Sequence, residues 1–268
     1  MILKSKSPIS EWWKTIFDER YLKTYVDATP PKATAQQVPF LLKALHLEKG
    51  AKILDLACGY GRHAIPLAKR GYQVTGLDFS RHFIELARSE AAKQGLKSSF
   101  LHGDMRKFSF QGEFDAIINI FSAFGYFEGE SDDALVLRNI SRALKSKGRL
   151  LMDLNNTLGT LIRAAQQGTT DRKTGRLTNI RKEKLSNGFT VKEKNEFLPE
   201  TMHWVTTKSW KEKGQKHGYQ FKVRAFILPE LKRLMEQNGL RVERLWGGFD
   251  GSPFRFDSRR LIILARKA

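Results

Sequence analysis

Three carboxylates occupy positions from which they could grip a small ligand. Asp55 lies near the end of a short apolar segment, just before a loop that contains Gly59 and Gly61. Asp78 ends the next apolar segment, where a carboxylate can accept two hydrogen bonds from a ribose diol. Asp104 follows the third apolar segment. If these segments are parallel strands, all three carboxylates lie at the edge where open α/β sheets bind their ligands.

The loop of residues 57–62 suits a close approach between backbone and ligand. Its glycines can adopt conformations closed to other residues, and the helix expected after it begins with unpaired N–H groups. With Asp78, the Gly-x-Gly-x-x-Ala pattern of residues 59–64 also satisfies the dinucleotide fingerprint of nicotinamide dehydrogenases. We expect a different ligand, because Asp55 would place negative charge beside a pyrophosphate but suits a cationic amino group. Asp104 also has no role in the nicotinamide scheme.

A sheet is needed to bring these carboxylates together, and the sequence predicts one. From residue 51 onward, short apolar segments alternate with amphipathic ones, which is typical of a parallel sheet with helices on both faces. Ser80 offers an N-cap for one of these helices. The sequence therefore predicts a doubly wound α/β fold with a mostly parallel seven-stranded sheet. Its strands are expected at residues 52–56, 73–77, 98–102, 114–121, 149–154, 242–246 and 261–265, and its helices at 61–70, 80–94, 132–144 and 229–239.

Two segments lie outside this alternation. Residues 1–50 are expected to form a helical cover, with one helix over residues 11–25 and a second over residues 34–45. Residues 158–226 are expected to form an inserted antiparallel β cap, because four strands follow one another there with only turns between them. These strands are expected at residues 176–185, 189–197, 203–210 and 219–226. The α/β domain then comprises residues 51–157 and 227–268.

The stretch from Asp55 to Gly61 resembles the first motif of class I S-adenosylmethionine-dependent methyltransferases, in which an acidic residue precedes a Gly-x-Gly loop. Residues 114–121 resemble the fourth motif, and residues 122–127 and 249–254 are similar to a bacterial subgroup of small-molecule type. The resemblance covers about residues 11–268. It implies a Rossmann-like methyltransferase fold and S-adenosylmethionine as cofactor, with S-adenosylhomocysteine as its product.

The resemblance also implies which residues hold the cofactor. Asp55 would bind the methionine amino group, Asp78 would grip the ribose hydroxyls, and Asp104 and Met105 would contact adenine. Ala57 stands where glycine is commoner, which should narrow the loop. The helix over residues 11–25 is either a lid over the cofactor or a cover for the sheet. The expected cofactor-binding residues are Asp55, Ala57, Gly59, Gly61, Asp78, Phe79, Asp104, Met105, Asn119, Tyr21 and Tyr25.

The same resemblance implies in-line methyl transfer, in which the enzyme aligns the acceptor and excludes water. A general base would help an O- or N-nucleophile. Segments that leave the sheet beside the cofactor, and the cap strands, supply the catalytic candidates Tyr126, Asn155, Asp250 and His203. Further residues that could reach the pocket are Asn119, Ser122, Phe124, Asp153, Asn156, Ser252 and Arg255.

Each candidate also has a purely structural interpretation. Tyr126 could be core packing, and residues 250–253 form an ordinary turn by their composition. For Asn155 and Asn156 we favour capping of the helix that follows them. His203 and its neighbour in the cap, His217, are expected to face solvent rather than the pocket. His63 is expected to be structural.

The composition limits where in the cell the protein is expected and whether it binds a metal. No apolar run approaches the length of a membrane span, and the N-terminus lacks the apolar core of a secretion signal. Cys58 is the only cysteine, so an internal disulfide is excluded, and we expect it to be a packed small residue. The six histidines show no metal-ligand spacing. We expect a cytoplasmic protein with no metal site.

The formal charge of +19, from 47 basic and 28 acidic residues, attracts anions. We expect an acceptor that is a small molecule, and the charge is compatible with an anionic one. The alternative is an RNA methyltransferase, since the cap mixes Lys and Arg with the aromatic residues Trp204, Trp210, Tyr219 and Phe221. Residues 119–122 lack the proline motif of enzymes that methylate base amines, which counts against base N-methylation but not against other RNA chemistry. A third hypothesis is a cofactor-binding protein without transferase activity.

Overall fold

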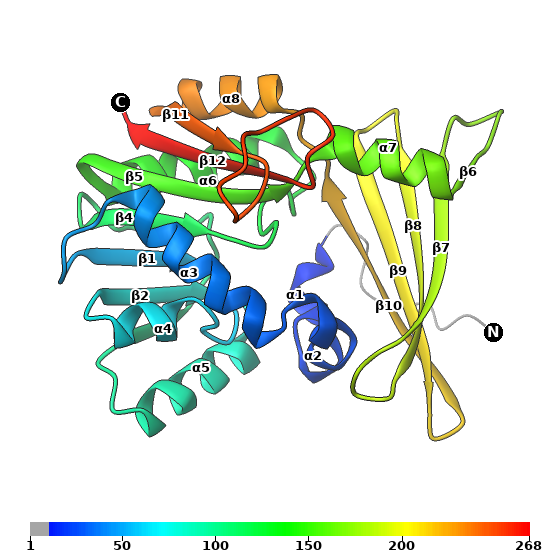
Figure 1. Ribbon diagram of the computed structural model, residues 1–268, viewed down its shortest axis with the longest axis horizontal. Coiled ribbons are helices and arrows are strands. Elements are labelled where there is room, and N and C mark those ends of the chain that lie inside the picture. The colour runs from blue at the N-terminus through cyan, green and yellow to red at the C-terminus, as the bar shows by residue number, and fades with distance from the viewer. Residues whose placement is uncertain (1–10) are drawn as a thin grey trace.

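The computed structural model describes residues 11–268, so residues 1–10 of the predicted helical cover lie outside the described residues. Figure 1 shows two sheets that face each other across helices α1 and α2. One is a seven-stranded sheet of mostly parallel strands, and the other is a five-stranded antiparallel sheet. The predicted fold class is confirmed. No helix among the described residues is both long and apolar enough to cross a membrane.

The seven-stranded sheet has the order β11-β12-β5-β4-β1-β2-β3. Its strands β1 to β5 pair in parallel, and β12 alone runs antiparallel to its neighbours β5 and β11. The central strands are apolar and buried on both faces, as a covered parallel sheet requires. The strands are β1 (Lys52–Leu56), β2 (Gln73–Asp78), β3 (Ser99–His102), β4 (Phe114–Asn119), β5 (Leu144–Asn155), β11 (Leu240–Trp246) and β12 (Arg260–Lys267).

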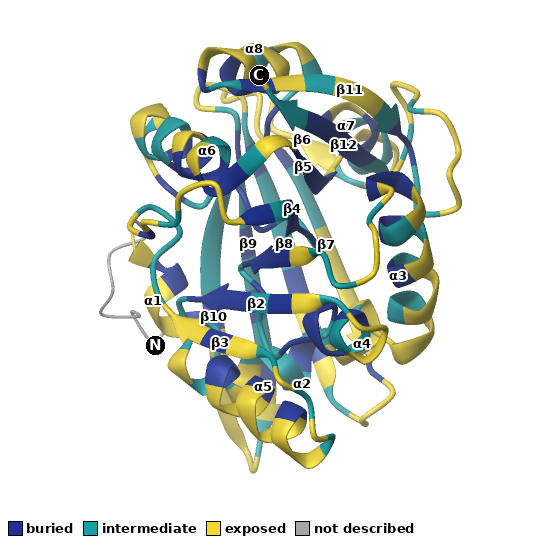
Figure 2. Cartoon of the chain, turned by 90° about the vertical axis from the view of Figure 1, so that its left-hand side faces the viewer, coloured by how far each residue is buried: buried dark blue, intermediate teal, exposed yellow. Residues whose placement is uncertain are grey.

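Helices cover both faces of this sheet. Helices α3 (Pro31–Leu45), α4 (Ala64–Lys69) and α5 (Arg81–Lys93) share one core with the strands. Helices α6 (Glu130–Ala143) and α8 (Leu228–Gln237) share a second core on the other face. Figure 2 shows the resulting pattern, with a buried central strand β4 and helices that alternate between buried and exposed residues.

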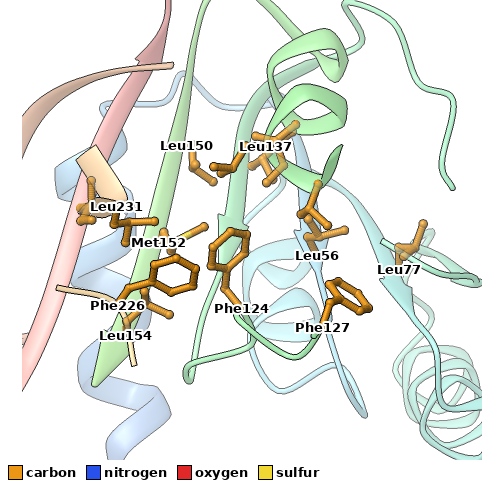
Figure 3. Close-up of a cluster of buried hydrophobic side chains, with 14 of the residues drawn as sticks. Leu56, Leu77, Phe124, Phe127, Leu137, Leu150, Met152, Leu154, Phe226 and Leu231 are labelled. Atoms are coloured by element: carbon orange, nitrogen blue, oxygen red, sulfur yellow. The ribbon is translucent and has the colours of Figure 1, made fainter. Parts of the chain in front are cut away.

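The second core also ties the antiparallel sheet to the α/β domain. Figure 3 shows Phe226, which follows the last cap strand, beside Phe124 and close to Met152 and Leu154 of β5. The ring centroids of Phe124 and Phe226 are 5.4 Å apart, and both rings are almost fully buried. The point where the chain returns from the cap is therefore fixed by core packing.

The N-terminal segment differs from the single helix expected over residues 11–25. It forms α1 (Trp13–Ile16), α2 (Glu19–Tyr25) and a 3-10 turn, η2 (Val26–Ala28). The break arises at Asp18, whose carboxylate accepts hydrogen bonds from the backbone N–H groups of Arg20 and Tyr21 and so caps a new helix. Pro31 occupies the first turn of α3, which begins three residues earlier than expected.

The antiparallel sheet is joined to β5 by α7 (Thr157–Gln167), and its strands follow one another in sequence order. The last hairpin is tighter than expected, because Lys213 and Gly214 both adopt positive φ and let β10 begin at Gln215. The strands are β6 (Thr169–Thr170), β7 (Leu177–Lys184), β8 (Thr190–Leu198), β9 (His203–Glu212) and β10 (Gln215–Arg224).

The aromatic residues of this sheet do not form the solvent-facing stacking surface that an RNA-binding cap would need. Trp210 and Tyr219 are buried at 4% and 7% exposure in the shared core. Trp204 and Phe221 line a cavity between this sheet and the rest of the molecule. The mixture of lysine and aromatic residues in the sequence therefore reflects the two faces of one sheet, which alternate along each strand.

Candidate active site

Two cavities meet at α1 and α2. The first has a volume of about 350 Å³ and lies against the carboxyl ends of β1, β2 and β4; we call it the sheet cavity. The second has a volume of about 640 Å³ and lies against α7 and the antiparallel sheet; we call it the cap cavity. Five aromatic side chains line both cavities and form the junction between them: Phe17, Tyr21, Tyr25, Phe121 and Tyr126.

Asp55 is the most unusual group of the sheet cavity. Its side chain is 2% exposed, and its Oδ2 atom has no hydrogen-bond partner among the described residues. Burial raises its pKa to about 7, although the nearby Arg62 guanidinium opposes the shift. A buried carboxylate oxygen without a hydrogen-bond partner is costly, so this position is suited to receive a cationic group from a ligand.

The loop after β1 has the conformation that its glycines predict. Gly59 and Gly61 have φ of 55° and 84°, and Ala57 has φ of 60°. Ala57 thus occupies the left-handed region, which explains why glycine would be easier to accommodate there. A Cβ atom on Gly61 would lie 3.0 Å from the Cδ1 atom of Ile65, so this position has little room for a side chain.

Asp78 joins this loop to the end of β2. Its Oδ2 accepts a hydrogen bond from the Gly59 N–H and its Oδ1 accepts one from the Ser80 N–H, each at 2.8 Å. Burial raises the pKa of Asp78, while these two backbone donors act in the opposite direction. Each carboxylate oxygen keeps a lone pair, so Asp78 can still accept hydrogen bonds from a diol.

Asp104 is held by a charged neighbour. Arg106 donates to it in a bidentate arrangement, with Nη2 2.7 Å from Oδ2, and the guanidinium lies 4.3 Å from the centroid of the Phe127 ring. Burial alone would raise the pKa of Asp104, but Arg106 keeps it below its usual value. Phe79 and Met105 line the cavity beside this pair.

Nine of the eleven expected cofactor-binding residues line the sheet cavity, and the exceptions are Gly61 and Asn119. The Asn119 side chain is fully buried and donates to the backbone oxygens of Leu56 and Ala123, at 3.0 and 3.2 Å. It therefore supports the loop after β4 from behind. Tyr21 and Tyr25 lie over the sheet cavity and also wall off the cap cavity.

Arg62 is a cavity residue that sequence reasoning missed. Its Nη1 atom donates to Thr34 and Gln37 of α3, at 3.0 and 2.6 Å. Its positive charge acts to lower the pKa of Asp55. The available signal was its position directly after Gly61 at the start of the helix. The aromatic residues Trp13, Phe17 and Tyr60 also line the sheet cavity, and only the tertiary packing of α1 and the loop reveals them.

The four catalytic candidates fall into two groups. Tyr126 lines both cavities, and Asn155 lines the cap cavity, where its Oδ1 accepts a hydrogen bond from Arg260. Asp250 is exposed and accepts hydrogen bonds from the backbone and hydroxyl of Ser252, so the structural interpretation as a turn holds. His203 is buried at 7% exposure outside both cavities, so it faces neither the pocket nor solvent.

Several other expected residues also act elsewhere. Arg255 is exposed and, like Ser252, does not line either cavity. His217 stacks on Trp210, with ring centroids 5.8 Å apart. His63 lines the sheet cavity but its Nε2 lies 2.9 Å from Gln37 Oε1, and burial lowers its pKa well below the usual value. Phe124, by contrast, lines the cap cavity and also packs in the core.

The expected capping of α7 by an asparagine side chain is wrong. Asn156 occupies the N-cap position, but its amide makes no cap hydrogen bond. It donates instead to the backbone oxygens of Phe256 and Ser258, at 2.8 and 2.9 Å. Tertiary contact with residues 247–258 has replaced the local interaction that the sequence favours. Asn156 therefore anchors this loop over the start of α7.

Asp153 positions the loop after β4. Its carboxylate is 1% exposed and makes a bidentate ion pair with Arg260, with both N···O distances at 2.7 Å. It also accepts a hydrogen bond from the Phe121 N–H at 3.0 Å, and its backbone oxygen accepts one from Ser122 at 2.9 Å. Phe121 and Ser122 have φ of 72° and 59°, so β4 ends before the expected residue 121. These contacts hold the strained turn that places Phe121 between the cavities.

The cap cavity contains few groups that could take up a proton. Among the described residues, Glu193 is the single carboxylate that lines this cavity, and no described histidine lines it. Lys208 lies 3.2 Å from Glu193 and Arg181 lies 2.8 Å from it. Burial alone would raise the pKa of Glu193, but these partners and Asn195 hold it below the usual value. Burial also raises the pKa of Tyr21, Tyr25 and Tyr126.

Cys58 is buried, and burial raises the pKa of its thiol well above the usual value, as expected of a packed small residue rather than a nucleophile. No group of three His, Cys, Asp or Glu side chains within residues 11–268 is arranged to hold a metal ion.

Comparison with known proteins identifies the central segment. Residues 53–148 match the family model described as "Methyltransferase domain". The chain is 35% identical over 100 residues to the dTDP-3-amino-3,6-dideoxy-alpha-D-glucopyranose N,N-dimethyltransferase of Streptomyces fradiae, a match that covers 37% of this chain and 38% of that protein. The chain spans less than half the length of the curated relatives it matches first.

Solved structures share the fold over nearly the whole chain. The CcbJ methyltransferase from Streptomyces caelestis superimposes with a TM-score of 0.80 at 20% identity, covering 95% of this chain and 99% of that one. The SAM-bound CalS10, an amino pentose methyltransferase from Micromonospora echinaspora, gives a TM-score of 0.65 at 18% identity, covering 94% and 98% of the two chains. At these identities the likeness establishes the common fold.

Proposed function

We propose that this chain, whose residues 53–148 match a methyltransferase domain, transfers a methyl group from S-adenosylmethionine to an amine nitrogen of a small molecule. The observation that carries the choice of acceptor is the cap cavity, which adjoins the sheet cavity but offers no free base. The proposal thus assigns the cofactor to the sheet cavity and the acceptor to the cap cavity.

The residues of the sheet cavity fit the cofactor. The amino acid end of S-adenosylmethionine carries an ammonium and a carboxylate, and Asp55 and Arg62 offer the opposite charges at one place. Asp78 has free lone pairs for the ribose hydroxyls, while Phe79 and Met105 provide apolar surface for adenine. When bound, the cofactor supplies a methyl group activated by its sulfonium. The five aromatic side chains of the junction would surround that methyl group.

The acceptor is an amine because the cap cavity does not help to deprotonate a weaker acid. A hydroxyl requires a base to develop nucleophilic character, whereas a neutral amine already presents a lone pair. Glu193 is paired with Lys208 and Arg181, and the tyrosines remain protonated phenols near neutral pH. The Streptomyces fradiae relative, which is an N,N-dimethyltransferase by name, supports the same choice.

The aromatic junction has a chemical role in this proposal. The cofactor is cationic before transfer and the methylated amine is cationic afterwards. Aromatic faces attract cations, and the five rings shared by the two cavities surround the path between them. They also exclude water from the reacting atoms, which favours the amine over hydrolysis. Tyr126 therefore acts as part of this wall.

The test uses methyl-tritiated S-adenosylmethionine with extract of the source cells. We expect label in the small-molecule fraction, carried by a product whose gained methyl group resides on nitrogen. The Asp78→Ala variant should lose this label, because the ribose grip and the loop contact are both removed. Label confined to a nuclease-sensitive precipitate would contradict the proposal and favour the RNA alternative. An O-methylated product would contradict the choice of acceptor atom alone.

A further inference from the structure

We propose that the cap cavity binds an anionic group of the acceptor, a phosphate or a carboxylate, between Arg163 and Arg259. This inference rests on the proposed function for the identity of the ligand as the acceptor. It assigns the acceptor to molecules that carry an amine at one end and an anion at the other.

The cap cavity is strongly cationic. Five arginines line it, against the single carboxylate of Glu193. Three of them are neutralised: Arg181 pairs with Glu193 at 2.8 Å, Arg260 pairs with Asp153 at 2.7 Å, and Arg224 pairs with Glu130 at 3.0 Å and also with Glu230. The other two, Arg163 and Arg259, make no ion pair with a carboxylate among residues 11–268. They are the cations with capacity for a ligand.

Arg163 is held in place by weak neutral partners. Its Nη1 donates to the backbone oxygen of Asp257 at 3.2 Å and its Nη2 donates to Thr160 at 3.4 Å. Both distances are long for a guanidinium, and neither partner carries a charge at the atom concerned. The contacts orient the side chain on α7 without satisfying its charge.

Arg259 reinforces the demand for an anion. Its side chain makes no hydrogen bond within the described part of the chain and is exposed at the cavity wall. Burial lowers the pKa of Arg163, and the charge of Arg259 lowers it further. Two guanidinium groups that repel each other gain when an anion binds between them. Such groups match the planar and bidentate geometry of phosphate and carboxylate oxygens.

The same cavity supplies neutral hydrogen-bond donors. The amide side chains of Asn155, Gln167 and Asn179 line the same cavity and can donate to an anion without competing for it. Arg163 and Arg259 line the cap cavity but not the sheet cavity. The anionic group therefore binds away from the junction, and the rest of the acceptor extends from it toward the aromatic wall.

The experiment measures anion binding without cofactor or acceptor, so its outcome is independent of methyl transfer. Isothermal titration of the full chain at low ionic strength uses inorganic phosphate, pyrophosphate and acetate as probes. The test variant is Arg163→Gln/Arg259→Gln. The control is Arg233→Gln/Arg255→Gln, which also removes two positive charges. Its two side chains are 58% and 74% exposed and lie outside both cavities.

We expect the test variant to weaken binding of at least one probe by about tenfold or more, and the control to change it less than about twofold. The probe that responds tells whether the acceptor carries a phosphate or a carboxylate. Equal loss in the two variants, or no binding to the unmodified chain, would overturn the proposal. Arg163→Lys/Arg259→Lys keeps both charges and should retain most of the binding, which separates loss of charge from damage to the fold.

Discussion

Tyr21 and Tyr25 stack on each other one helical turn apart in α2, with ring centroids 4.2 Å apart and planes inclined by 18°. The antiparallel sheet holds this pair from the other side. The Nζ atom of Lys208 lies 3.4 Å from the centroid of the Tyr25 ring and donates to the backbone oxygen of Thr24 at 3.0 Å. Helix α2 thus covers the sheet cavity and also forms the wall that separates the sheet cavity from the cap cavity.

The first prediction concerns the pH dependence of cofactor binding. The pKa of Asp55 is raised to about 7 in the free protein, and an ammonium ligand prefers the ionised carboxylate. Affinity for S-adenosylhomocysteine should therefore rise with pH by up to about tenfold per unit below 7 and level off above it. Asp55→Asn should bind weakly with little pH dependence. Calorimetric titration between pH 5 and 8 measures both variants; a flat profile for the unmodified chain would contradict the assignment.

The same shift has a consequence for stability with the opposite sign. A carboxyl group whose pKa is raised on folding favours the folded state when it is protonated. Its contribution is therefore complete below the ordinary pKa of 3.8 and is lost as the pH rises through about 7. In urea unfolding without ligand, Asp55→Asn should gain stability relative to the unmodified chain between pH 4 and 8. A constant difference across that range would show that Asp55 does not titrate there.

The second prediction concerns the buried pair of Glu193 and Lys208, whose side chains are 11% and 7% exposed. Glu193→Gln leaves a buried ammonium without its main counterion, so unfolding should cost about 3 kcal/mol less at pH 7. Because the pKa of Glu193 is lowered on folding, this difference should shrink as the pH falls below 4.5. Adding Lys208→Met to the variant should recover part of the loss. Additive effects of the two substitutions would mean that the pair is not coupled.

The third prediction tests whether Tyr126 is part of the aromatic wall or a general base. Burial keeps Tyr126 protonated well above neutral pH, so its hydroxyl does not accept the acceptor's proton. Tyr126→Phe should leave the pH at half-maximal turnover within about 0.3 units of the unmodified value, whatever its effect on kcat. Tyr126→Ala opens the junction and should lower kcat more than Tyr126→Phe does. Loss of one limb of the pH profile in Tyr126→Phe would identify the phenol as the base.

The fourth prediction concerns the close approach between β2 and its neighbours. A Cβ atom on Gly76 would lie 2.7 Å from both the Cys58 sulfur and the Phe100 ring, so Gly76→Ala should destabilise the fold by about 3 kcal/mol. Gly103→Ala is the matched control, since its Cβ would make only ordinary contacts at 3.5 Å with Leu77. Urea unfolding measures both. Similar stability of the two variants would show that the core near Gly76 can relax.

Local signals predicted the elements that local interactions stabilise. Ser80 caps α5 as expected, because its hydroxyl accepts a hydrogen bond from the Phe83 N–H three residues away. The break at Asp18 escaped prediction, since the aromatic spacing continues across it and only the cap hydrogen bonds reveal the new helix. The predicted capping by Asn156 was wrong for the opposite reason, because its amide bonds to a distant loop instead of capping α7. The local signal at Asn156 therefore failed because distant segments meet there, whereas the local cap at Asp18 was hidden by the continuing aromatic spacing.

The residues of the site also differ in how far the sequence could predict them. The carboxylates Asp55, Asp78 and Asp104 could be placed in advance, because parallel strands bring their carboxyl ends to one edge. Arg163 and Arg259 could not, since nothing in the sequence indicates that α7 and the loop before β12 face each other. His203 was expected to face solvent, yet the segments around β9 bury it.

The most direct test of this account is a crystal structure of the chain with S-adenosylhomocysteine. We predict that the ligand occupies the sheet cavity, with its amino group at Asp55 and its ribose hydroxyls within hydrogen-bond distance of Asp78. The sulfur should face the aromatic junction and leave the cap cavity open to the acceptor. A ligand in the cap cavity, or a sulfur turned away from the junction, would contradict the division of the two cavities between cofactor and acceptor.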